Sequence, residues 1–278
     1  MYQVLVAVDE NVQRSMEQAR AVTNLSGEID SLSVTIAHSF SYKSTDDDIE
    51  DLESVSEVTS FFDEIGIDYQ LQQAQEEPTD FVLSTAAEVG ADLICVGSRK
   101  KSPVGKALLG SVSQQLILRS DWPILLAGKA ELQNSSPERV LLPVDANKER
   151  GLKAAESIVE LPRNPADYEV VVLNVFEEFD VVDDAESVRS EDLYDETDVP
   201  ESVDAVVDVL ESAGVNVTTR REHGQPSEEI LNAAEEINAD LIAINGRKRS
   251  PTGKILFGSV TQSVILSTDR SVLTMGNN

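Results

Sequence analysis

The 278-residue sequence has little cysteine and little histidine. It contains one cysteine, Cys95, and two histidines, so it can form no disulfide within the chain and offers too few ligands for a zinc site of the usual kind. Cys95 lies in an apolar run, which fits a reducing compartment. The two histidines occupy non-equivalent positions in the two halves of the chain, and we assign no catalytic and no metal-binding residues.

Long apolar segments are absent as well. No run approaches the roughly 18 apolar residues of a membrane span. The first residues, MYQVLVAVDE, have no basic stretch followed by a long apolar one, so they do not resemble a signal peptide. We therefore expect a cytoplasmic protein that does not insert into membranes.

Basic side chains are scarce relative to acidic ones. The chain has 22 Lys and Arg against 51 Asp and Glu, a formal net charge of -29. Such a balance argues against unaided binding to nucleic acid or to an anionic membrane. The acidic excess is spread over the predicted helices, which keeps a protein soluble by self-repulsion and is typical of halophiles. An acidic protein from a mesophile is the alternative.

The few basic residues are gathered in two similar loops. Residues 99–111 read RKKSPVGKALLGS, and residues 247–259, 148 positions later, read RKRSPTGKILFGS. Eight of the 22 basic residues lie in them: Arg99, Lys100, Lys101, Lys106, Arg247, Lys248, Arg249 and Lys254. Each loop follows an apolar run, ADLICV or ADLIAI, and precedes a stretch with helical character. A basic, glycine-containing loop before a helix start is an arrangement that binds anions.

The loops are part of a repeat that covers most of the chain. VLVAVD, ending at Asp9, matches LLPVD, ending at Asp145, 136 positions later. The offset then grows to 148, because the second copy carries 12 extra residues within 177–198, a segment with 11 acidic residues that we expect to be an exposed loop. We predict two domains, residues 1–130 and 138–278, joined by a polar linker over 129–138.

Apolar periodicity in both copies alternates between helical and strand patterns. Helical faces recur at i, i+3, i+7 and i+10: Val55, Val58, Phe62 and Ile65 in the first copy, and Val203, Val206, Leu210 and Ala213 in the second. Gly66 and Gly214 follow as candidate C-caps. The strand runs are continuously apolar, as expected where helices cover both faces of a sheet. We predict an α/β fold of two tandem, doubly wound domains with parallel sheets.

A first strand that ends in aspartate, and a loop related to G-x2-G-x9-G-[ST] after the fourth strand, resemble the universal stress protein family. The resemblance extends over nearly all of both halves. It implies a five-stranded parallel sheet of order 3-2-1-4-5 in each half, with helices on both faces and pairing through the last strand. The two halves would then form an internal pseudo-dimer, and a homodimer of the whole chain stays open.

The resemblance also implies a binding site for ATP or another adenine nucleotide, with Mg²⁺ bound only through the nucleotide. Asp9 and Asp145 would contact the ribose or adenine, and the backbone at Ser39 and Val175 the base. The candidates for the phosphate end are Gly97, Arg99, Lys100, Gly110, Ser111, Val112 and Ser113 in the first copy, and Lys248, Gly258, Ser259, Val260 and Thr261 in the second.

Both copies depart from the glycine pattern. Lys100 stands at the second glycine position of the first copy, and Asn245 and Lys248 replace both early glycines of the second. A lysine there would either crowd the phosphate path or direct its ammonium at a phosphate, and the sequence leaves both readings open. The first copy keeps more of the pattern, so we expect it to bind before the second.

Two other nucleotide motifs do not fit. A Walker loop has four residues between its first glycine and the Gly-Lys pair, whereas seven residues separate Gly97 from Gly105, and six separate Gly246 from Gly253. A Rossmann fingerprint requires G-x-G-x-x-G after the first strand, where this chain has VDENVQRS.

Several candidates have simpler structural explanations. Asp9 and Asp145 would serve equally well as caps of the first helix in each half, and Ser111 and Ser259 are natural N-caps, although an anion suits the open helix start better. We expect His38 to be a packed or hydrogen-bonded residue at the end of its strand.

These patterns favour a non-catalytic, nucleotide-responsive stress protein, in which a small phosphorylated ligand orders the loops and shifts the affinity for an unknown protein partner. One alternative is a slow ATP hydrolase, although no general base is evident. Another is a ligand-free regulatory scaffold whose basic loops dock an acidic or phosphorylated partner protein.

Overall fold

Both halves of the chain fold as alternating strands and helices. The computed structural model describes residues 1–27, 31–40, 48–98, 109–129, 138–177, 200–246 and 258–275. The first half comprises β1 (Tyr2–Ala7), α1 (Val12–Leu25), β2 (Leu32–Ser39), the short η2 (Ile49–Asp51), α2 (Glu53–Ile65), β3 (Tyr69–Ala74), α3 (Pro78–Val89), β4 (Leu93–Gly97), α4 (Ser111–Arg119) and β5 (Ile124–Ala127). The second comprises β6 (Glu138–Pro143), α5 (Lys148–Val159), the short η3 (Pro165–Asp167), β7 (Tyr168–Glu177), α7 (Glu201–Ser212), β8 (Asn216–Gly224), α8 (Pro226–Glu236), β9 (Leu241–Ala243), α9 (Ser259–Ser267) and β10 (Ser271–Thr274).

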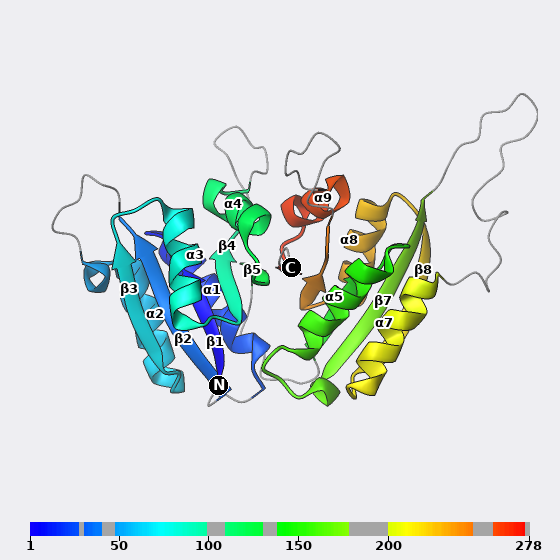
Figure 1. Ribbon diagram of the computed structural model, residues 1–278, viewed down its shortest axis with the longest axis horizontal. Helices are drawn as coiled ribbons and strands as arrows, with labels where there is room; N and C mark the ends of the chain where they lie inside the picture. Colours follow the sequence, from blue (N-terminus) through cyan, green and yellow to red (C-terminus); the bar gives the residue numbers. More distant parts are fainter. Residues whose placement is uncertain are drawn as a thin grey trace, which may run out of the picture.

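The strands form one sheet of ten (Figure 1), in the order β3-β2-β1-β4-β5-β10-β9-β6-β7-β8. Within each half the pairings are parallel and follow the order 3-2-1-4-5, so the predicted α/β class is confirmed. The halves join where β5 pairs antiparallel with β10, with Leu125 opposite Leu273. The two five-stranded sheets are therefore continuous rather than separate.

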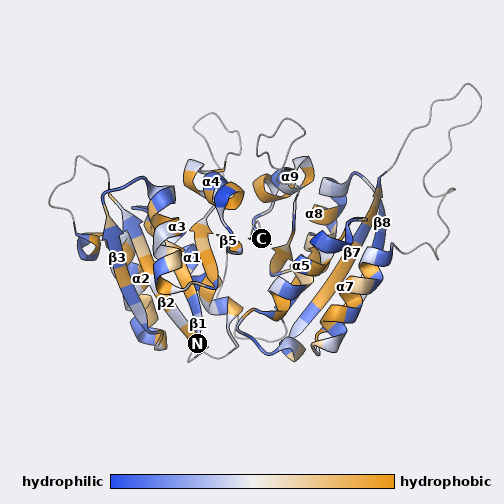
Figure 2. Ribbon diagram, viewed as in Figure 1, coloured by the Kyte–Doolittle hydropathy of each residue, from blue (hydrophilic) through white to orange (hydrophobic). Residues whose placement is uncertain are grey.

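Helices cover both faces of the sheet, as the uninterrupted apolar strands predict. One buried cluster joins α1, α2, α5 and α7 to the sheet, and a second joins α3, α4, α8 and α9 to the opposite face. Successive strand residues alternate between the two clusters: Val4 and Val6 belong to the first and Leu5 to the second. Figure 2 shows the apolar colour concentrated on the strands and on the inward sides of the helices.

At the junction of the halves, close backbone packing requires a glycine at position 128. A Cβ on Gly128, just after β5, would lie 2.3 Å from the carbonyl carbon of Arg270 and 2.4 Å from the carbonyl oxygen of Asp269. The backbones of the two halves approach this closely only because residue 128 has no side chain.

The helix ends differ slightly from the predictions. Gly66 is the left-handed C-cap of α2, with φ 79°, as expected. In the second half the C-cap of α7 is Ala213, and Gly214 follows it with φ 90°, so the predicted cap lies one residue too late.

Several predictions fall outside the described residues. The eight basic residues of the two loops lie in 99–108 and 247–257, and most of the acidic segment lies in 178–199, so the expectations for them remain predictions. No helix within the described ranges is long and apolar enough to cross a membrane.

Candidate functional site

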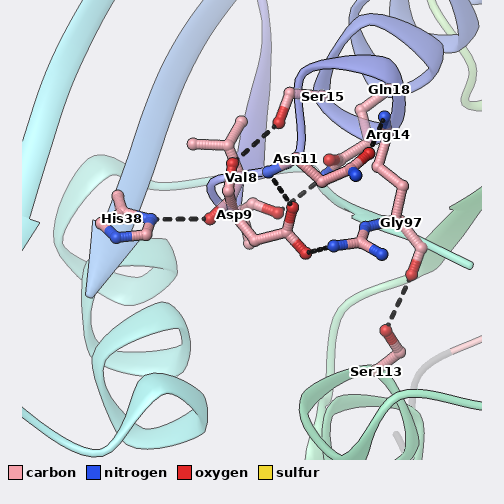
Figure 3. Close-up of polar contacts among 10 residues, drawn as sticks. Val8, Asp9, Asn11, Arg14, Ser15, Gln18, His38, Gly97 and Ser113 are labelled. Atoms are coloured by element: carbon pink, nitrogen blue, oxygen red, sulfur yellow. Dashed lines mark hydrogen bonds and ion pairs between the residues drawn. The ribbon is translucent and has the colours of Figure 1, made fainter. Parts of the chain in front are cut away.

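The candidate site of each half lies beyond the carboxyl ends of its central strands. β1 and β4 are neighbours whose chains continue to opposite sides, which is where ligands bind in open parallel sheets. Asp9 follows β1, Gly97 ends β4, and α4 begins close by, since the Ser113 hydroxyl donates to the Gly97 carbonyl at 2.9 Å. The structure therefore brings these three predicted site residues together (Figure 3).

Asp9 is fixed by the turn between β1 and α1, but it is not the N-cap of α1. Its Oδ1 accepts from the backbone N–H of Asn11 at 2.9 Å, and Asn11 is the N-cap of α1, accepting from the N–H of Arg14 at 2.9 Å. The Arg14 guanidinium returns to Asp9 Oδ2 at 2.5 Å (Figure 3). Capping of α1 by Asp9 was one of the two roles considered above, and that assignment is wrong because Asn11 takes it.

The second half repeats the arrangement. Asn147 is the N-cap of α5 and donates its own N–H to Asp145 Oδ1 at 2.9 Å, and Arg150 is ion-paired with Asp145 Oδ2. The guanidinium is the less exposed partner, with 21% of the Arg150 side chain accessible against 59% for Asp145. Each aspartate is therefore already ion-paired with an arginine of the helix that follows it.

The neighbouring strand fixes this turn in each half. His38 is buried at the end of β2, and its Nδ1 donates to the Val8 carbonyl at 3.0 Å. Asn174, at the equivalent place on β7, donates through Nδ2 to the Val144 carbonyl at 2.8 Å. The expectation that His38 is a packed, hydrogen-bonded residue is confirmed.

One substitution between the halves changes the space beside the turn. Ser15 in α1 donates its hydroxyl to the Asp9 carbonyl at 3.2 Å, whereas the equivalent residue of α5 is Gly151. The Asp145 carbonyl instead accepts from Ser202 of α7 at 2.7 Å. The same bond is thus made from another helix, and Val206 of α7 packs where a side chain at position 151 would begin, since a Cβ there would lie 2.9 Å from Val206 Cγ2.

The helices that follow the loops begin without a side-chain cap. Gly110 and Gly258 are the N-caps of α4 and α9, and among the described residues no N-cap side chain accepts a hydrogen bond from the backbone N–H groups of either helix start. Ser111 and Ser259 are first helical residues, so their expected role as N-caps is wrong. The first backbone N–H groups of α4 and α9 lie at the positive end of the helix dipole.

A cavity of about 400 Å³ opens in the second half between these features. Its volume falls within the range of small-molecule sites, and it combines apolar walls with polar and charged side chains. Its lining includes Asp145, Arg150, Gly151, Leu173, Val175, Pro226, Ile230, Ile244, Asn245, Gly246, Gly258, Ser259, Val260 and Thr261. The six predicted candidates of this half that the structure describes all line it, although the first half was expected to bind before the second.

Gly246 allows two of the segments that line this cavity to pack closely together. A Cβ at this position would lie 2.3 Å from Thr261 Oγ1, so the end of β9 and the first turn of α9 pack directly against each other. Asn245 donates its side-chain amide to the Arg150 carbonyl at 3.4 Å, which ties the same strand end to α5.

The other first-half candidates are placed as follows. The Ser39 hydroxyl donates to the Glu76 carbonyl at 2.7 Å, and Val112 packs partly buried against the core. Arg99 and Lys100, like Lys248 of the second half, lie outside the described residues.

Sequence reasoning missed Asn11, Arg14 and their counterparts Asn147 and Arg150. The signal was present, because VDENVQRS and VDANKERG share the pattern D-x-N-x-x-R at the same offset of 136. Among the described residues there is no group of three or more His, Cys, Asp or Glu side chains placed to hold a metal ion.

Comparison with known proteins supports one family. The model of the universal stress protein family matches residues 1–128 and 137–275. A universal stress protein of Mycolicibacterium smegmatis is 33% identical over 72 residues, which are 26% of this chain and 55% of that protein. The stress response protein NhaX of Bacillus subtilis is 30% identical over 74 residues, 27% of this chain and 45% of that protein. The chain thus spans about half the length of the curated relatives it matches.

Solved structures share the fold along nearly the whole chain. A universal stress protein of Archaeoglobus fulgidus has a TM-score of 0.65 at 20% identity, covering 99% of this chain and 98% of that one. A functionally unknown protein of Pseudomonas aeruginosa has a TM-score of 0.67 at 15% identity, covering 99% and 92%. With a family model matched in both halves, the chain belongs to the universal stress protein family.

Proposed function

We propose that this chain is a non-catalytic, nucleotide-responsive stress protein whose second half binds an adenine nucleotide or a similar phosphorylated ligand. The observation that carries the proposal is the cavity of about 400 Å³, which places an uncapped helix start, a guanidinium and an apolar wall around one space.

The charges at the cavity favour a phosphorylated ligand. The N–H groups at Ser259 and Val260 lie at the positive end of α9, and Arg150 offers N–H donors beyond those paired with Asp145. The carboxylates of Asp145 and Glu177 also line the cavity, so the donors available to a phosphate are Arg150 and these N–H groups. Phosphate oxygens would accept from them.

The remaining walls suit a nucleoside. Leu173, Ile230 and Ile244 supply apolar surface for a base, and Val175, near the end of β7, lines the same space. Both oxygens of Asp145 already accept one hydrogen bond, but a carboxylate has further acceptor capacity, so a ribose hydroxyl remains a suitable partner. Any Mg²⁺ would be bound by the phosphates of the ligand.

We further propose that residues 1–130 and 138–278 are two domains that form an internal pseudo-dimer in the cytoplasm, and that ligand binding shifts the affinity for a protein partner. The antiparallel pairing of β5 with β10 supports the pseudo-dimer. A shift of this kind requires that the partner prefer one state of the loops over the other.

The proposal is tested by identifying the ligand that co-purifies with the protein. Wild-type protein and the variants Arg150→Gln and Arg14→Gln are purified in high KCl and denatured, and the supernatants are analysed by mass spectrometry. We expect AMP, ADP or ATP from wild type and from Arg14→Gln, and much less from Arg150→Gln. An empty supernatant, together with no thermal shift on addition of ATP, would refute nucleotide binding and favour the ligand-free scaffold. Steady release of phosphate from added ATP would instead favour the hydrolase.

A further inference from the structure

A second cavity, of about 240 Å³, lies between the two halves and is separate from the nucleotide candidate. The first half contributes the end of α1, β5 and Lys129, and the second contributes the starts of β6, β9 and β10. The lining residues are Ala21, Asn24, Leu25, Leu125, Lys129, Glu138, Arg163, Ala239, Asp240, Leu241, Arg270 and Ser271. None of them lines the cavity beside Asp145.

Positive charge is concentrated at this inter-half cavity. Of the 22 Lys and Arg residues, twelve fall within the described ranges, and three of these twelve line it: Lys129, Arg163 and Arg270. Lys129 pairs with Asp269 across the junction at 3.1 Å, and Arg270 donates to the Ala239 carbonyl. Glu138 and Asp240 are the acidic lining residues, so with Lys129 paired to Asp269 the two guanidinium groups of Arg163 and Arg270 stand against these two carboxylates.

Glu138 and Arg163 are buried here and incompletely satisfied. Their side chains are 7% and 10% exposed, and Arg163 Nη2 lies 3.4 Å from Glu138 Oε2. Within the described part of the chain, neither Glu138 Oε2 nor Arg163 Nε has a hydrogen-bond partner. Arg163 Nη2 also donates to the Asn24 carbonyl at 2.5 Å, and this bond restrains the orientation of the guanidinium relative to Glu138.

Glu138 Oε2 lacks a donor and Arg163 Nε lacks an acceptor, so a single partner for both must donate one hydrogen bond and accept another. Buried polar groups without partners are rare and costly, and each calls for an explanation such as a bound ion or a water. Burial raises the pKa of Glu138 to about 7 in spite of Arg163, which agrees with a carboxylate short of donors. A ligand that satisfies both groups needs a hydrogen-bond donor for Glu138, such as an O–H, and anionic oxygens for the guanidinium groups.

We propose that the inter-half cavity binds inorganic hydrogen phosphate, whose P–OH donates to Glu138 while its other oxygens accept from Arg163 and Arg270. Hydrogen phosphate is a small oxyanion that keeps an O–H at neutral pH. Sulfate carries none, and a phosphate monoester has lost its last hydrogen above its second pKa, near about 6. The site should therefore distinguish phosphate from both.

The ligand would join the two halves. Glu138 begins the second half, and Arg163 already reaches across to the C-terminal end of α1, where the helix dipole favours a cation. Phosphate bound there would contact residues of the inter-half surface directly, so its occupancy would stabilise the arrangement of the halves.

The test is isothermal titration calorimetry at pH 8 in KCl, with sodium phosphate, sodium sulfate and glycerol 3-phosphate as separate ligands. We expect phosphate to bind roughly tenfold or more tightly than either of the others, the usual effect of losing one hydrogen bond to a charged group. Arg163→Gln and Arg270→Gln should each weaken phosphate roughly tenfold. Glu138→Gln, which is nearly isosteric, should narrow the difference between phosphate and sulfate to about threefold or less, because an amide can donate to sulfate.

Arg139→Gln serves as the control for loss of one positive charge, since Arg139 pairs with Glu169 on the surface and lines neither cavity. If Arg163→Gln does not fold, Glu138→Gln and Arg270→Gln carry the test. Absence of phosphate binding would mean that the cavity holds water only. That result, equal affinity for sulfate, or phosphate binding that none of the three cavity variants alters would each overturn the proposal.

Discussion

Replacing Glu138 by Gln should change how the stability of the protein depends on pH. Glu138 is buried at the start of β6 between the two halves, and burial raises the pKa of its carboxyl from the ordinary value of 4.5 to about 7. Arg163 opposes this rise and Asp240 adds to it, but loss of hydration is the largest cause.

The direction of this pH dependence follows from how many protons the folded and unfolded states bind. Because the folded-state pKa is raised, the folded protein keeps a proton on Glu138 over a pH range in which the unfolded chain has released it. The resulting contribution to stability is complete below pH 4.5 and is lost as the pH rises to about 7. A shift of this size corresponds to roughly 3 kcal/mol at most.

The assay is urea unfolding at fixed KCl, in a phosphate-free buffer series from pH 5 to pH 8, for wild type and Glu138→Gln. The other carboxylates titrate in both proteins, so the informative quantity is the difference in unfolding free energy at each pH. That difference should move in favour of the variant as the pH rises, by about 2 kcal/mol or more. Glu169→Gln, which removes a half-exposed partner of Arg139, is the control and should show no such trend. A difference that stays constant across the series would refute the burial argument.

Three further results are expected. Gly128→Ala should lower the unfolding free energy by about 3 kcal/mol or more, because its Cβ would overlap the backbone of Arg270, whereas Gly27→Ala, with its nearest contact at 3.4 Å, should unfold almost as wild type does in the same urea titration. Asn11→Ala should cost about 1 kcal/mol through loss of the α1 cap, and an unchanged urea midpoint would contradict that assignment. Burial raises the pKa of the Cys95 thiol, so native protein should react with a thiol reagent far more slowly than urea-unfolded protein, and equal rates would show that the β4 core opens readily.

The sequence was sufficient to predict the sheet and the helices that cover it. Apolar runs such as ADLICV and the spacing of Val55, Val58 and Phe62 reflect burial that the structure shows directly, since these residues belong to its core clusters. The repeat indicated where equivalent residues lie in the two halves. These features are local, so they can be read from periodicity.

The site depended on contacts that local patterns do not determine. Asp9 and Asn11 both favour helix starts, and only the backbone geometry decides that Asn11 is the cap. Gly151 stands in the second half where the first has Ser15, and the equivalent hydrogen bond comes from Ser202 of another helix, a contact that the local sequence does not indicate. Glu138 stands beside a polar linker in the sequence, and its burial results from packing of one half against the other.

The central claim is that the second-half cavity binds a phosphorylated nucleotide. Its most direct test is a calorimetric titration of ligand-free protein with ATP, performed on wild type, Arg150→Gln and Arg14→Gln. The account predicts one ATP per chain in wild type and in Arg14→Gln, and an affinity weakened roughly tenfold or more in Arg150→Gln, where a charged hydrogen-bond donor is lost. No binding in wild type, or binding that Arg14→Gln abolishes while Arg150→Gln leaves it intact, would contradict it.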